Sequence, residues 1–159
     1  MTRVFPNRLR FAALLSLGLL GTLTACSPVV TVDAAPDAAN PGCAPMMVIL
    51  PQYVADFPRR ETSSQATAAW GDPSQVILRC GVQVPGPTTD QCVSVNDVDW
   101  VLREGENGYW TATTYGRTPA TELIFRPDDV AESSVLMDLS AAASEIPQER
   151  KCLSITDVL

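Results

Sequence analysis

The sequence predicts an α+β domain in which an antiparallel sheet of about four to five strands packs against two or three helices, with two disulfides. Three observations carry this prediction. Short runs rich in Val, Trp, Tyr and Thr alternate with turn residues between positions 76 and 125. A helical spacing of apolar residues follows at 128–146. The chain also has five cysteines, an odd number that becomes even once the first is assigned elsewhere.

The first 25 residues predict a bacterial lipoprotein signal peptide. A positive segment, MTRVFPNRLR, precedes an apolar run at 11–23, whose 13 residues are too few to span a bilayer. Leu23-Thr24-Ala25-Cys26 then has the pattern of a lipobox, in which the thiol of Cys26 accepts a diacylglycerol and the leader is removed before it. Two acyl chains are enough for stable membrane attachment. The alternative is a plain secretory signal in which Cys26 is accidental.

The charge of the chain beyond the leader limits its partners. The remaining 134 residues hold 8 of the 11 basic residues and all 18 acidic ones, which gives a net charge of −10. Nucleic acid is excluded as a partner, because its phosphates require a basic footprint. Electrostatic adhesion of the whole domain to anionic lipid is disfavoured for the same reason. Membrane contact is therefore expected through the lipid on Cys26.

Residues 26–42 are predicted to be the lipid-bearing Cys26 followed by a disordered linker. The segment SPVVTVDAAPDAANPG is rich in Pro, Ala and Asp and has no aromatic residue, so it has little surface to bury. A random coil of this length spans roughly 22 Å, which would hold the domain away from the membrane. The alternative is an ordered edge strand at 29–32. One folded domain is expected at 43–159.

Four cysteines remain in this domain, and an exported chain with an even number predicts disulfides. Three pairings are possible. We expect Cys80 to pair with Cys92, because their flanking segments can form two strands around the turn-rich PGPTTD. Cys43 would then pair with Cys152 and tie the ends of the domain together. Zinc is the rival interpretation, but the chain has no His and no C-x-x-C spacing, so no metal or other cofactor is expected.

The elements of the domain follow from period and turn residues. We expect a short helix at 51–55 and a turn of helix or a loop at 66–70, which ends at Gly71-Asp72-Pro73. Asn107-Gly108 predicts a hairpin turn. A helix at 128–146 has acidic residues at its start and Pro147 at its end. The strands are expected at 76–80, 92–95, 97–104, 109–115 and 120–125.

Four motifs in this domain resemble a known family. WGDP begins at Trp70, LRCG contains Cys80, YGR-P begins at Tyr115, and RKC ends at Cys152. Together they resemble the actinobacterial domain-of-unknown-function family 3515, over most of residues 43–152. The resemblance implies a small lipoprotein or secreted protein without an assigned reaction. Genes of the family commonly lie near genes of cell-wall precursor synthesis, which implies a role in the cell envelope.

Four side chains are candidates for a binding surface. Arg117 and Tyr115 flank Gly116 at a predicted turn, where side chains are presented to solvent, and the guanidinium suits an anionic ligand. The alternative is that Arg117 pairs with an internal acid such as Asp72. Arg79 has the same two interpretations, and Trp70, like Trp100, is expected in the core more than at a ligand.

The paired acids Asp97 and Asp99 are expected at a solvated edge. Catalytic constellations are disfavoured, because no His can serve a nucleophilic Ser and no P-loop or G-x-S-x-G occurs. We therefore expect a non-enzymatic binding or accessory module on the outer face of the cytoplasmic membrane, with an envelope protein or cell-wall ligand as partner. The alternative is an enzyme or enzyme accessory in peptidoglycan metabolism.

Overall fold

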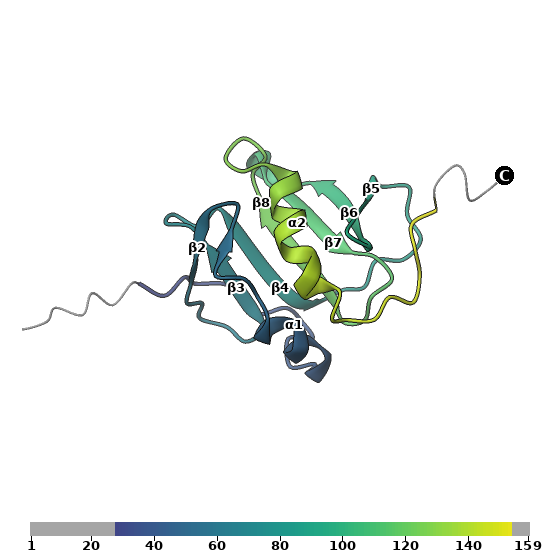
Figure 1. Cartoon of the computed structure of the whole chain (residues 1–159), viewed down its shortest axis with the longest axis horizontal. Helices are drawn as coiled ribbons and strands as arrows, with labels where there is room; N and C mark the ends of the chain where they lie inside the picture. The colour runs from purple at the N-terminus through teal and green to yellow at the C-terminus, as the bar shows by residue number, and fades with distance from the viewer. Residues whose placement is uncertain (1–27, 154–159) are drawn as a thin grey trace, which may run out of the picture.

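The computed structural model describes residues 28–153, so the predicted signal peptide and Cys26 lie outside the described residues. One face of an eight-stranded sheet is covered by the helices α1 (Ala44–Val48) and α2 (Glu132–Ala143), as Figure 1 shows. The α+β class, the antiparallel sheet and the two disulfides are confirmed. The strand count is corrected from four or five to eight. None of the helices within 28–153 has the length and apolar character needed to cross a membrane.

The sheet has the spatial order β1-β2-β3-β4-β8-β7-β6-β5, and every neighbouring pair is antiparallel. The chain therefore leaves the middle of the sheet after β4, starts again at the far edge with β5, and returns to β8 through three consecutive antiparallel connections, β5–β6, β6–β7 and β7–β8. Two 3-10 turns, η1 (Pro41–Cys43) and η2 (Glu106–Gly108), complete the elements. The strands are β1 (Tyr53–Val54), β2 (Phe57–Arg60), β3 (Thr67–Trp70), β4 (Val76–Val82), β5 (Cys92–Val95), β6 (Val98–Glu104), β7 (Trp110–Thr114) and β8 (Ala120–Phe125).

The five expected strands are all present, and the three additional ones precede them. The helix expected at 51–55 is wrong: the chain turns through Ala55 and Asp56, which both have positive φ, between β1 and β2. The turn of helix or loop expected at 66–70 is also wrong, because Thr67–Trp70 is strand β3. All four residues of β3 are buried, so its sequence lacks the alternation that marks a half-buried strand.

The core lies between the sheet and α2. The helix contributes Val135, Leu136 and Leu139, all at most 1 % exposed. Trp70 and Trp100 on the sheet are fully buried, which confirms the core interpretation of both. The helix is shorter than the expected 128–146. The predicted Asn107-Gly108 turn is confirmed between β6 and β7, and Asn107 has a φ of 56°.

The segment 28–42 is packed against the domain, so the expectation of a disordered linker is wrong for these residues. Val30 donates its amide to Glu61 O (2.8 Å) and accepts a hydrogen bond from the amide of Ser63 (2.9 Å). This parallel bridge alongside β2 favours the alternative of an ordered edge segment. Val32, Ala35 and Ala38 are each less than 10 % exposed. Small side chains spaced by three residues give the segment a narrow apolar stripe, which its overall composition conceals.

Candidate functional site

The disulfides pair Cys43 with Cys80 and Cys92 with Cys152, so the expected pairing is wrong while the number is confirmed. The Cα atoms are 6.0 Å apart in the first pair and 6.3 Å apart in the second. The reason lies in the topology. β4, which carries Cys80, pairs with β3 and β8, whereas β5, which carries Cys92, lies at the far edge beyond β7 and β6. Adjacent segments in the sequence are therefore separated by three strands.

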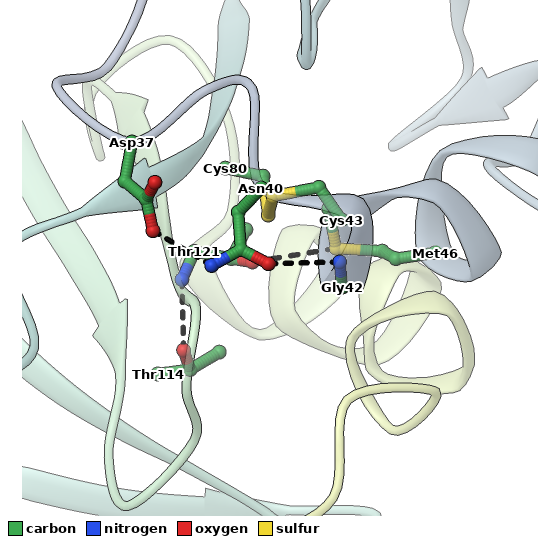
Figure 2. The surroundings of a disulfide bond; sticks show 8 residues. All are labelled: Asp37, Asn40, Gly42, Cys43, Met46, Cys80, Thr114 and Thr121. Atoms are coloured by element: carbon green, nitrogen blue, oxygen red, sulfur yellow. Dashed lines mark hydrogen bonds between the residues drawn. A yellow bond between two sulfur atoms is a disulfide. The ribbon is translucent and has the colours of Figure 1, made fainter.

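The Cys43–Cys80 disulfide is enclosed in the core, with its cysteines 2 % and 0 % exposed. Figure 2 shows that it joins the turn around Asn40 to the central strand β4. Asn40 caps η1 by accepting a hydrogen bond from the amide of Gly42 (2.9 Å) and donates its own amide to Asp37 (2.7 Å). This disulfide therefore fixes the N-terminal segment to the sheet and presents nothing to solvent.

Two of the four predicted binding residues, Trp70 and Arg79, make contacts within the fold. The Trp70 indole is buried and donates to Pro51 O (3.1 Å). Arg79 forms an ion pair with Glu122 on the neighbouring strand β8 (2.9 Å). Gly81, which follows in the LRCG motif, has a φ of +90°, and a Cβ at this position would collide with the backbone of Asp37. The binding interpretation of Trp70 is therefore wrong, because the side chain is fully buried, and the ion pair of Arg79 favours the alternative of an internal partner for that residue.

The prediction that Arg117 is presented to solvent at a turn is also wrong, because the residue is only 4 % exposed. Its guanidinium donates to the carbonyl oxygen of Ile146, just beyond α2, and to Asp97 O (3.0 Å). Burial lowers the pKa of Arg117, and the nearby carboxylate of Asp99 partly opposes this shift. The expected alternative partner is wrong as well, since Asp72 forms its ion pair with Arg60 (3.0 Å).

Residues 146–153, here called the C-terminal strap, cross the end of the sheet and are held by the YGR motif. The amide of Glu149 donates to Gly116 O (2.6 Å), and a Cβ on Gly116 would collide with the backbone of Arg150. Asp99 accepts two further hydrogen bonds from the strap, from the Gln148 side chain (3.0 Å) and from the amide of Cys152 (2.7 Å). Asp99 is only 5 % exposed, so the expectation of a solvated edge is wrong for this residue.

Two hollows of about 380 Å³ each lie beside the strap and meet over the half-buried Cys92–Cys152 disulfide. We call them the strap hollows. Both are lined by the disulfide, Lys151 and Leu153. The first hollow also has the loop residues 87–90 and Tyr115 on its wall, and the second has Asp97 and Asp99. Among the predicted binding residues, Tyr115 alone is placed at a hollow.

The first strap hollow is lined by Lys151, by the Tyr115 ring and by Asp90, whose carboxylate is paired with Arg103 (2.6 Å). Tyr115 is half-buried, and the guanidinium of Arg150 lies 5.6 Å from the centre of its ring. The exposed ammonium of Lys151 follows directly in the chain. These groups suit a carboxylate or phosphate joined to a planar or apolar group. The sequence signal for these groups is the RKC motif, which places two cations side by side in an acidic chain.

The fold is a disulfide-linked α+β domain with two small hollows beside the C-terminal strap. The chain belongs to the family described as "Protein of unknown function (DUF3515)", whose model matches residues 9–152. No curated protein and no solved structure matches the chain.

Proposed function

We propose that the chain is a lipid-anchored protein of the bacterial cell envelope, on the outer face of the cytoplasmic membrane, that binds an anionic ligand group through the first strap hollow. The observation that supports the binding role is that Tyr115 and Lys151 line this hollow in a chain of net negative charge, with the Arg150 guanidinium over the Tyr115 ring. The ligand class is a carboxylate or phosphate on an envelope protein or a cell-wall component.

The location rests on the lipobox at Leu23–Cys26 and on the two disulfides, which form in oxidising compartments. Cells fed an alkyne fatty acid should label the wild-type chain and leave the Cys26→Ser variant unlabelled. A matched Ser27→Ala variant, which keeps the thiol, should label like the wild type. Label on the Cys26→Ser chain would overturn the anchor.

The binding role is tested with a photoreactive amino acid at Thr89 on the wall of the first strap hollow. Cross-linking in living cells should yield a defined adduct, and Lys151→Glu should reduce it strongly because the cation is reversed. The control is Arg126→Glu, which reverses the charge of a half-buried arginine outside the hollow that pairs with Asp129 and lies over the Tyr109 ring. Equal adduct in both variants would overturn the site.

A further inference from the structure

A hollow of about 510 Å³ lies at the opposite side of the sheet, along the outer edge of β2. Its residues combine two guanidinium groups and one carboxylate with amide and hydroxyl groups. They are Gln52, Arg59, Arg60, Glu61, Thr62 and Thr67. Glu61 is exposed on the rim, so water screens its charge, whereas Arg59 is half-buried at the hollow.

Arg59 is distinguished from the other arginines by its contacts within residues 28–153. Four arginines form the ion pairs of this part of the chain: Arg60, Arg79, Arg103 and Arg126. Arg117 is buried against carbonyl groups, and Arg150 lies over Tyr115. Arg59 has only a long hydrogen bond to Leu50 O (3.5 Å). Most of its donor capacity therefore remains for a ligand.

The N-terminal segment enters the domain beside this hollow. Arg60, on the hollow wall, donates a hydrogen bond to Pro28 O (2.8 Å). The backbone of Val30 is hydrogen-bonded to the backbones of Glu61 and Ser63. Cys26 precedes Pro28 by two residues, which span at most about 7 Å of extended chain. A lipid on Cys26 would therefore bring the membrane surface to the β2 edge.

We propose that this hollow binds the phosphate of a phospholipid headgroup through Arg59 and sets the β2 edge of the domain on the membrane. The inference rests on the proposed lipid anchor. The planar fork of a guanidinium matches two phosphate oxygens, and the Gln52 amide adds a further donor at the wall. The strap hollows at β5 lie six strand spacings away, roughly 29 Å across the sheet, and point toward the cell wall.

The orientation is tested with the processed, lipidated protein in nanodiscs of phosphatidylglycerol and phosphatidylcholine that contain a gadolinium-chelate lipid. The side-chain Nε–Hε signal of Arg59 should lose more than half of its intensity. The signal of Arg103 on β6, five strand spacings or roughly 24 Å away, should stay nearly unchanged. Equal attenuation of the two, or stronger attenuation of Arg103, would overturn the proposal.

The phosphate contact is tested with a chain that begins at Ser27, and so has neither the leader nor the lipid, added to phosphatidylglycerol vesicles. Arg59→Gln should weaken vesicle binding about fivefold, as expected for one cation at a membrane surface, whereas Arg103→Gln should not. Inorganic phosphate at the same phosphate concentration should shift the Arg59 signal less than vesicles do. An equal shift, or no effect of Arg59→Gln, would overturn the headgroup site.

The failure of the anchor is distinguishable from the failure of the headgroup site. The mass of the purified processed protein shows whether Cys26 carries diacylglycerol. An unmodified mass overturns the anchor, and with it the membrane-facing orientation. A modified mass combined with unaffected vesicle binding of Arg59→Gln overturns the headgroup site alone.

Discussion

The two edges of the sheet each hold a terminal segment, and they hold it in different ways. At the β2 side, the segment 28–42 begins at the bridge between Val30 and Thr62, passes to Gly81 on β4, and is fixed there by the enclosed Cys43–Cys80 disulfide. At the β5 side, the C-terminal strap is held by the half-buried Cys92–Cys152 disulfide, beside two open hollows. The first disulfide therefore belongs to the core, whereas the second forms a wall of both strap hollows, the first of which we propose as a ligand site.

The two disulfides also differ in how freely the residues around them can be substituted. Beside the core disulfide, Gly81 cannot be replaced without strain, because a Cβ there would collide with the backbone of Asp37. The strap side offers exposed positions such as Lys151 and Leu153 that can change without disturbing the sheet. Ligand specificity is thus expected to vary at the β5 side.

The largest effect is expected when the core disulfide is removed by Cys43→Ala with Cys80→Ala. Chain entropy for a separation of 37 residues gives a loss of about 4 kcal/mol in the free energy of unfolding. Lost packing at two buried positions adds to this loss. Urea unfolding followed by Trp fluorescence measures it. The matched control is Cys92→Ala with Cys152→Ala, which removes a disulfide that closes a longer loop, with a separation of 60 residues. A larger loss in the control would show that loop length alone decides, and the comparison of the two edges would fail.

A smaller but still large loss is expected for Arg117→Ala. The substitution leaves the carbonyl of Ile146 and the buried carboxylate of Asp99 without their cation, which costs about 3 kcal/mol. Arg103→Ala, which removes an exposed arginine, should cost less than about 1 kcal/mol. Thermal unfolding monitored by circular dichroism compares the two. A loss for Arg117→Ala no greater than that of Arg103→Ala would show that the strap does not depend on this residue.

Prediction from sequence succeeded where the signal was local and failed where it depended on the order of strands. The hairpin at Asn107-Gly108 and the strand at 120–125 were found, because turn residues and alternation are local features. The disulfide pairing was missed, since it depends on β8 entering the sheet beside β4. Arg117 was misplaced because a turn in the sequence is not exposed when another segment, here the strap, covers it.

The two disulfides should also differ in their reaction with a mild reductant. Cys92 and Cys152 are half-buried beside open hollows, whereas Cys43 and Cys80 are enclosed. A phosphine reductant under native conditions, followed by alkylation and peptide mapping, should modify Cys92 and Cys152 first. Urea should remove the difference, because it exposes both pairs. Simultaneous modification in native buffer would contradict the distinction drawn from burial.

The smallest expected effect concerns the loop that forms the outer wall of the first strap hollow. A hydrogen bond from Thr88 and, next, one from Arg103 (2.6 Å) lower the pKa of Asp90 below its usual range. A lowered pKa in the folded state means that the contact is complete above the ordinary pKa of an aspartate and is lost as the pH falls through the folded pKa. The loop should therefore separate from Arg103 only below about pH 4. The Nε–Hε shift of Arg103, followed from pH 7 to pH 2, measures this separation, and Asp90→Asn should remove the transition. A transition that persists in Asp90→Asn would assign it to another carboxylate and leave the loop independent of this pair.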